Sequence, residues 1–175
     1  MKIRKANIKD AMGIARVHTV SWKETYKGMI NQDFLEKLSV EKRLALWNEI
    51  LSNADAIVYV AVNRNDEIIG FASFGAKRPE TNTNDGELYA IYLLEEYKRK
   101  GIGKLLLEAG LKDLIASGFS TMFVWVLAAN SSRAFYQLFA PVKVMTETVS
   151  LGDDIYEEVL YCWHDLQQLL CLLKT

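Results

Sequence analysis

The segment with the clearest chemical character is a basic turn that carries two glycines and leads into a leucine-rich stretch. Its sequence is Tyr97-Lys98-Arg99-Lys100-Gly101-Ile102-Gly103-Lys104, and it follows a strand-like segment at 87–93. Glycine lets the backbone approach a ligand closely and adopt a positive φ. The first turn of the following helix leaves amide donors unpaired and points the positive end of its dipole outward. These groups, with the cationic side chains beside them, predict a cradle for phosphate groups.

Two common phosphate-binding motifs do not match this turn. The P-loop pattern Gly-x-x-x-x-Gly-Lys-Ser/Thr is absent. The dinucleotide fingerprint needs a third small residue where Leu106 stands, and it belongs near the start of a repeating βαβ domain, whereas this glycine pair lies mid-chain. A basic turn at a helix start, with no ligand, stays open as the alternative.

A second segment makes the pattern specific. It is Trp125-Val126-Leu127-Ala128-Ala129-Asn130-Ser131-Ser132-Arg133-Ala134-Phe135-Tyr136. The glycine turn resembles the acetyl-CoA loop of the GNAT superfamily of N-acetyltransferases, written Arg/Gln-x-x-Gly-x-Gly/Ala. The second segment resembles the strand, asparagine and Ala-x-x-Phe-Tyr helix of that superfamily. The first strand and helix and the pattern Trp22-x-x-Thr25-Tyr26-x-Gly28 are similar to family members too, so the resemblance covers residues 1–165.

Three departures from the family pattern matter. Lys98 replaces the usual Arg/Gln. Lysine is a cation, but it has no planar side-chain group with several fixed hydrogen-bond donors. Glu95 stands where proline is frequent. Phe139-Ala140-Pro141 replaces the frequent Gly-Phe, which leaves the path of the chain after Phe139 open.

The resemblance implies a single-domain α/β fold with a mixed, splayed central sheet of about seven strands and helices on both faces. Hydrophobic patterning predicts a compatible order of elements. Strands are expected at 3–6, 56–62, 68–74, 87–93, 119–127, 142–149 and 155–163. Helices are expected at 8–26, 32–38, 101–117, after Ser39 and after Asn130, and 75–86 is expected to be a polar loop. Residues 1–165 form the predicted N-acetyltransferase domain, and the leucine-rich tail 166–175 is either a terminal helix or a dimer contact.

For acetyl-CoA, the resemblance implies that backbone amides of 99–104 hold the pyrophosphate. The pantetheine arm would pair with the strand edge at 91–93 like an added strand, because family structures splay the sheet there. The N–H of Leu93 would serve as the oxyanion donor. The expected cofactor-binding residues are Ile91, Tyr92, Leu93, Lys98, Arg99, Lys100, Gly101, Ile102, Gly103, Lys104, Asn130, Arg133 and Tyr136. No metal is expected.

Two residues are predicted to move protons. Tyr136 is the candidate general acid, because a phenol with a pKa near 10 can donate to a departing thiolate. The alternative is a packed aromatic residue. Glu87 matches a catalytic acidic position in some family members and is the candidate base for the amine; a water relay and an uninvolved loop-edge glutamate stay open. Alternation would put Glu87, Tyr89, Ile91 and Leu93 on one strand face.

Three residues of the first long helix are candidate acceptor-binding groups. His18, Trp22 and Tyr26 share one helical face at i, i+4 and i+8. Core packing is the alternative, and it is favoured for Trp22. The resemblance places this region along the acceptor cleft, where an aromatic wall would suit a cationic or apolar amine.

Composition limits the class of protein. The chain has 175 residues and a formal net charge of -1, which argues against a nucleic-acid binder. Neither a signal peptide nor a membrane-length apolar run is present, and Cys162 and Cys171 fit neither a disulfide framework nor a metal site. A cytoplasmic enzyme that acts on a small-molecule or peptide amine is therefore expected. The apolar C-terminal tail, and what is usual in the family that the chain resembles, suggest a homodimer. An acyl-CoA-binding sensor or an interaction domain of the same fold stays as the alternative.

Overall fold

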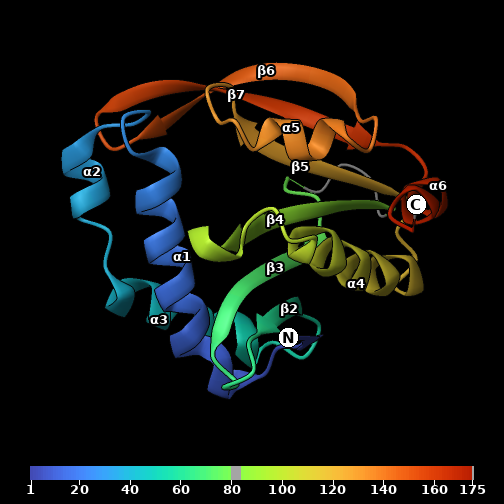
Figure 1. Ribbon diagram of the computed structural model, residues 1–175. Coiled ribbons are helices and arrows are strands. Elements are labelled where there is room, and N and C mark those ends of the chain that lie inside the picture. Colours follow the sequence, from blue (N-terminus) through green and yellow to red (C-terminus); the bar gives the residue numbers. More distant parts are fainter. Residues whose placement is uncertain (80–83, 175) are drawn as a thin grey trace.

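Seven strands form one mixed sheet in the computed structural model, which describes residues 1–79 and 84–174 (Figure 1). The strand order is β1-β2-β3-β4-β5-β7-β6. The strands are β1 (Lys2–Lys5), β2 (Ile57–Val62), β3 (Ile68–Ala76), β4 (Asp85–Leu93), β5 (Thr121–Leu127), β6 (Val142–Leu151) and β7 (Asp154–Trp163). The predicted fold class is confirmed. The predicted loop is shorter than 75–86, because β3 and β4 extend into it, and its positions 80–83 lie outside the described residues.

The β2–β3 hairpin is closed by an asparagine turn. The side chain of Asn63 accepts hydrogen bonds from the backbone N–H groups of Asn65 and Glu67. An asparagine that bonds to the backbone further along the chain is typical of a tight turn. The β-branched residues on either side pair antiparallel, so the predicted hairpin is confirmed.

Helices cover both faces of the sheet (Figure 1). Helices α1 (Ala11–Tyr26) and α3 (Val40–Ser52) pack on one face, and α4 (Ile102–Ala116) and α6 (Leu166–Leu172) on the other. Four leucines of α4 are fully buried, as their spacing predicts, and each contributes about 1.5–3 kcal/mol by leaving water. They are Leu106, Leu107, Leu111 and Leu114. The tail forms α6, in which Leu166 and Leu169 are buried against this same core.

The predicted first helix is divided in two. Residues Ile8–Asp10 form a 3-10 turn, and the α-helix begins at Ala11. Asn7 caps the turn as predicted, in a capping box with Asp10. The carboxylate of Asp10 also accepts two hydrogen bonds from the guanidinium of Arg4, at 2.7 and 2.8 Å. This ion pair ties β1 to the start of the helices.

The sheet splays between β4 and β5. These two strands run parallel and pair only where β4 begins, and the last pair joins Glu87 to Phe123. Figure 1 shows β4 turning toward α1 while β5 runs under β6 and β7. The end of α1, together with α2 (Gln32–Glu36), packs against the far end of β5 and against the β6–β7 hairpin. The splay predicted from the family resemblance is therefore present.

A β-bulge at Tyr89 overturns one prediction about β4. Ala90 pairs with Ser73 while Leu88 pairs with Phe74, so Tyr89 is an extra residue. An extra residue reverses the alternation of side chains beyond it. Leu88 packs on the α4 side together with Ile91 and Leu93. Glu87 and Tyr89 both contact Arg78, and the prediction that they share a face with Ile91 and Leu93 was wrong.

Candidate active site

The loop before α4 has the backbone shape of an anion cradle. Arg99 has a φ of 57° and Gly101 a φ of 77°, both in the left-handed region. Alternating left-handed residues turn successive N–H groups toward one concave side. The amides of the first turn of α4, which begins at Ile102, have no acceptor in a preceding turn. The backbone here can hold phosphate oxygens without help from side chains.

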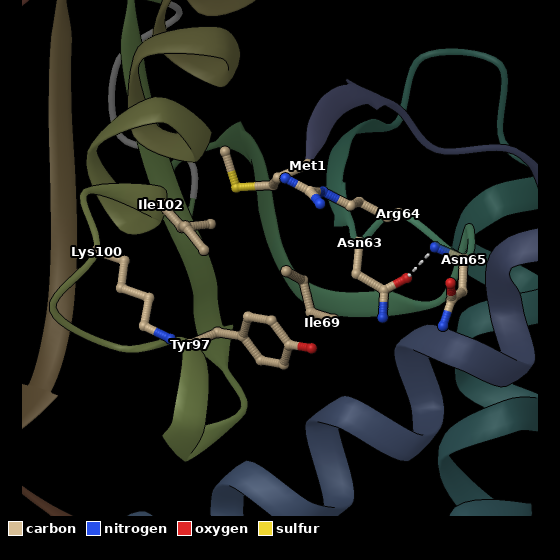
Figure 2. A pocket seen from close by; sticks show the side chains of 8 residues that line it. All are labelled: Met1, Asn63, Arg64, Asn65, Ile69, Tyr97, Lys100 and Ile102. Carbon is tan, nitrogen blue, oxygen red and sulfur yellow. Dashed lines mark hydrogen bonds between the residues drawn. The ribbon is translucent and has the colours of Figure 1, made fainter.

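The basic side chains of this loop are disposed unequally. Arg99 and Lys100 are exposed, whereas Lys98 and Lys104 are half-buried. The ammonium of Lys98 lies 2.6 Å from a carboxylate oxygen of Glu95, so the residue that replaces the family's Arg/Gln is already paired. Lys100 and Ile102 also line an open groove of about 560 Å³ (Figure 2). The other residues that line this groove belong to the chain start, the β2–β3 turn, β3 and Tyr97, and not to β5 or α5.

The free edge of β4 faces the splay. The N–H of Leu94 donates to Ile69 of β3. Successive N–H groups of a strand point to opposite edges, so the N–H of Leu93 points away from β3 and into the splay. The carbonyl of Leu93 accepts a hydrogen bond of 3.0 Å from the hydroxyl of Ser21, which is fully buried in α1. Ser21, which the sequence did not single out, thereby fixes the end of β4 against α1.

Tyr136 lies in α5 (Arg133–Gln137), on the β5 side of the splay. It is buried, and its ring contacts Phe135 and Trp163. Among the described residues, the hydroxyl of Tyr136 has no hydrogen-bond partner. Every side-chain oxygen of these residues that is fully buried does have one. The hydroxyl therefore reaches solvent-accessible space. Burial, and then the neighbouring Tyr26, raise the pKa of Tyr136 above its ordinary value, so the phenol stays protonated at neutral pH.

A chain of hydrogen bonds joins both sides of the splay. The hydroxyls of Tyr26 and Tyr92 lie 3.3 Å apart, and the amide nitrogen of Asn130 lies 3.4 Å from the hydroxyl of Tyr26. The amide oxygen of Asn130 accepts from the N–H of Ser132. Asn130 therefore caps the turn that leads into α5, while the helix itself begins three residues later at Arg133. Three predicted site residues are thus brought together.

Glu87 lies at the point where β4 and β5 part. Its side chain is buried, and both carboxylate oxygens are engaged by Arg78. One oxygen accepts from the backbone N–H at 2.8 Å and the other from the guanidinium at 3.2 Å. The guanidinium carbon also lies 3.7 Å from the ring centre of Tyr89. Arg78, a loop residue with no motif around it, therefore sets the orientation of this carboxylate.

His18 is buried behind Tyr92. Its ring stacks on Tyr92 with the centres 5.3 Å apart, and its Nδ1 lies 3.2 Å from the indole Nε1 of Trp47. Burial, and then the charge of Arg43, lower the pKa of His18 to about 3. A neutral imidazole accepts the hydrogen bond that the indole donates. His18 therefore contacts the candidate site by stacking on Tyr92.

Trp22 and Tyr26 pack against each other, with ring centres 4.7 Å apart. The guanidinium carbon of Arg43 lies 5.4 Å from the ring centre of Trp22. Arg133, a predicted cofactor ligand, instead donates inward to the carbonyl of Ala128 and the hydroxyl of Tyr161. Its guanidinium thus joins α5 to β5 and β7.

Glu158 of β7 is a further acidic residue at the site that the sequence pattern did not reveal. It pairs with Leu127, the last residue of β5, and with Glu147 of β6. Burial, and then the charges of Glu147 and Glu87, raise the pKa of Glu158. The sequence of β7 alone does not show which of the neighbouring residues Glu157 and Glu158 faces the site. Only the register of β7 with β5 shows this.

Comparison with known proteins identifies the class. A family model described as the acetyltransferase (GNAT) family matches residues 18–139. The chain is 41% identical over 172 residues to the uncharacterized N-acetyltransferase YuaI of Bacillus subtilis (strain 168), with 98% of each chain covered. It is 32% identical over 136 residues to the spermidine N(1)-acetyltransferase of Thermoplasma acidophilum, which covers 75% of this chain and 81% of that protein.

Solved structures agree. The crystal structure of the PaiA N-acetyltransferase from Thermoplasma acidophilum in complex with coenzyme A matches with a TM-score of 0.66 at 30% identity, over 90% of this chain and 96% of that one. A ribosomal-protein-alanine N-acetyltransferase from Brucella melitensis shares the fold, with a TM-score of 0.74 at 21% identity over 94% and 99% of the two chains. This chain belongs to the acetyltransferase (GNAT) family. It is an N-acetyltransferase that transfers an acetyl group to an amine.

The residues fit a coenzyme A thioester. A Cβ added at Gly101 would meet no atom within 4 Å, so there is open space beside the loop at this residue. The edge of β4 beyond Glu87 is not paired with β5, and its backbone can accept an extended partner. Within residues 1–79 and 84–174, no group of three or more His, Cys, Asp or Glu side chains could hold a metal ion. No helix of the same residues is long and apolar enough to cross a membrane.

Proposed function

We propose that this chain transfers the acetyl group of acetyl-CoA to a primary amine of a small molecule by direct attack within a ternary complex. The observation that carries the proposal is that the sheet opens between β4 and β5 beside the first turn of α4. An open strand edge suits an extended amide arm, and a helix start suits phosphates. The coenzyme A in the PaiA relative supports the donor, and the spermidine named for the Thermoplasma enzyme supports a small amine.

The proposed donor site has three parts. The backbone amides of residues 99–104 hold the pyrophosphate, with the cations of the loop around it. The free edge of β4 at residues 91–93 holds the pantetheine arm, and Asn130 closes the far side. Acetyl-CoA, when bound, supplies a thioester carbon that an amine can attack. The N–H of Leu93 is the proposed donor to the thioester oxygen as negative charge develops on it.

Tyr136 is the proposed general acid. Its pKa is raised, so its proton is present at neutral pH, and its hydroxyl has no competing partner among the described residues. The proton would pass from the phenol oxygen to the sulfur of the departing thiolate. Trp163 and Phe135 pack around the ring and hold the hydroxyl in one place.

Glu87 is the proposed end of the proton path from the amine. An amine with a pKa near 10.4 is almost entirely protonated at pH 7, so its proton must leave before attack. Because Arg78 binds both oxygens of Glu87, a water molecule between amine and carboxylate suits this arrangement better than direct contact. The free thiols Cys162 and Cys171 support a reducing compartment, and we place the reaction in the cytoplasm.

A single-turnover experiment with mass detection tests the proposal. Enzyme and an equal amount of acetyl-CoA are mixed with and without an amine panel that includes spermidine. Direct transfer predicts that coenzyme A appears only when an amine is present, that the amine gains the acetyl group, and that the protein mass stays unchanged. An acetylated protein would refute direct attack. Tight acetyl-CoA binding without transfer to any amine would favour a sensor of the same fold.

A further inference from the structure

Glu158 faces the acceptor side of the splay. Residues directly opposite each other in paired strands point to the same face of a sheet. Glu158 is opposite Leu127, and Leu127 packs against Tyr26 of α1. Its neighbour in sequence, Glu157, is exposed and points to the other face. The carboxylate of Glu158 therefore lies on the side where α1 and α2 close the opening, next to Tyr26.

Among the residues that the structure describes, no cation balances the carboxylate of Glu158. Within the described part of the chain, no side chain donates a hydrogen bond to it and no Lys or Arg pairs with it, whereas Glu87 is paired with Arg78. Glu147 of β6 stands directly opposite and is also negative. Like charges directly opposite one another destabilise a strand pair. The protein keeps this unfavourable pair at the wall of its acceptor site.

The surroundings of this carboxylate suit a cation. The aromatic rings of Trp22 and Tyr26 lie on the same side, packed at 4.7 Å between their centres. Aromatic faces attract ammonium groups, and a half-buried carboxylate binds them more strongly than an exposed one. An acceptor with a carboxylate at its far end would instead be repelled by Glu158 and Glu147.

The geometry points to Glu158 as the residue that binds a second ammonium group of the acceptor, so that the substrate class is a diamine or polyamine. This inference rests on the proposed acetyl transfer and names its acceptor. Glu87, where the strands part, serves the amine that reacts. Glu158, in β7 opposite the end of β5, holds the positive charge at the other end of the molecule. Glu158 is thus a specificity-determining residue and not the base.

Three amines that each contain four carbon atoms test this assignment: butylamine, putrescine and γ-aminobutyrate. They differ only at the far end, which is neutral, positive or negative. We expect putrescine to be acetylated with at least a tenfold higher kcat/KM than the other two. In Glu158→Gln the advantage of putrescine over butylamine should disappear through a higher KM, with kcat little changed. Glu157→Gln, which removes the neighbouring charge on the opposite face, should behave as wild type.

Binding gives a second, independent measurement. Putrescine is titrated calorimetrically into the complex of the protein with desulfo-CoA, where no transfer can occur. Wild type and Glu157→Gln should bind it, and Glu158→Gln should lose most of the affinity. Without ligand, Glu158→Gln should melt at a higher temperature than wild type, because a like-charge pair is removed.

Several outcomes would overturn the inference. Equal rates with all three amines, a preference for γ-aminobutyrate, or an unchanged KM for putrescine in Glu158→Gln would each do so. Transfer to butylamine with no preference for putrescine would leave the proposed acetyl transfer standing and remove only the acceptor class. Failure to bind acetyl-CoA at all would instead count against the proposed function.

Discussion

The carboxylate of Glu87 accepts hydrogen bonds from both the backbone N–H and the guanidinium of Arg78, at 2.8 and 3.2 Å. The two residues are nine apart in the sequence: Arg78 lies in the connection just after β3, and Glu87 is near the start of β4. Because both oxygens are held, the carboxylate has one orientation at the point where the sheet opens. This arrangement suits a group that receives a proton at a fixed place.

Glu87→Gln tests that role. Glutamine keeps an oxygen that can accept from the N–H of Arg78, but it cannot take up a proton. We expect kcat to fall about a hundredfold while the affinity for acetyl-CoA stays the same. Arg78→Met keeps the backbone donor and removes only the guanidinium, so it should lower kcat by a few-fold. A Glu87→Gln enzyme with wild-type kcat would exclude Glu87 as the proton acceptor.

Tyr136→Phe removes the hydroxyl proposed as the general acid and keeps the ring that packs against Trp163. Turnover should fall by one or more orders of magnitude, because the departing thiolate loses its proton donor. Calorimetry with desulfo-CoA should show little change in affinity, and the melting temperature should stay close to that of wild type. Steady-state rates equal to wild type would remove this role from Tyr136.

Gly101→Val should abolish binding of acetyl-CoA while the protein stays folded. Gly101 has a φ of 77°, which a β-branched residue adopts only with strain, so the loop that presents the amides must shift. Gly118→Val is the matched control: its φ is 91°, and a Cβ there would likewise meet no atom within 4 Å. Both variants should lose similar stability, about 1–3 kcal/mol, but only Gly101→Val should lose binding. Normal affinity in Gly101→Val would disprove the loop assignment.

The buried imidazole of His18 should make stability depend on pH. Its pKa is lowered from 6.5 to about 3, so between these values the unfolded chain binds a proton that the folded chain does not. Stability from this source is complete above pH 6.5 and is lost as the pH falls toward 3. Between pH 8 and pH 5 the free energy of unfolding should drop by about 2 kcal/mol through His18 alone.

His18→Asn separates this contribution from all others. Asparagine keeps an oxygen near the position of Nδ1 that can accept from Trp47, but it does not titrate. The variant should lose some stability at pH 8 and show a shallower decline toward pH 5. Urea unfolding at the two pH values measures both effects. Parallel pH curves for the two proteins would show that the imidazole is not held neutral.

Much of this architecture could be predicted because local chemistry determines it. Alternating or β-branched runs became strands, and Asn7 and Ser39 became caps. Four leucines of 101–117 became the buried face of α4. The glycine turn and the Asn130 to Tyr136 segment carried enough pattern to identify the family. The observed limits of helices and strands differed from the predicted ones by a few residues. The first helix began with a 3-10 turn, which hydrophobic periodicity does not distinguish from an α-helix.

Long-range geometry could not be predicted in this way. The bulge at Tyr89 depends on how β3 and β4 pair, so simple alternation placed Glu87 on the wrong face. Arg78 and Ser21 contact the site only after folding and carry no motif. Glu158 differs from Glu157 only through the register of β7 with β5. Arg133 fits a sequence motif, yet its donors are engaged within the fold.

Calorimetric titration of the purified protein shows whether the opening between β4 and β5 and the loop before α4 form an acetyl-CoA site. Acetyl-CoA and desulfo-CoA should both bind with micromolar affinity at a single site per chain, because both compounds carry the pyrophosphate and the pantetheine arm to which the proposed binding contacts are made. If neither compound bound, this part of the molecule would not be an acetyl-CoA site.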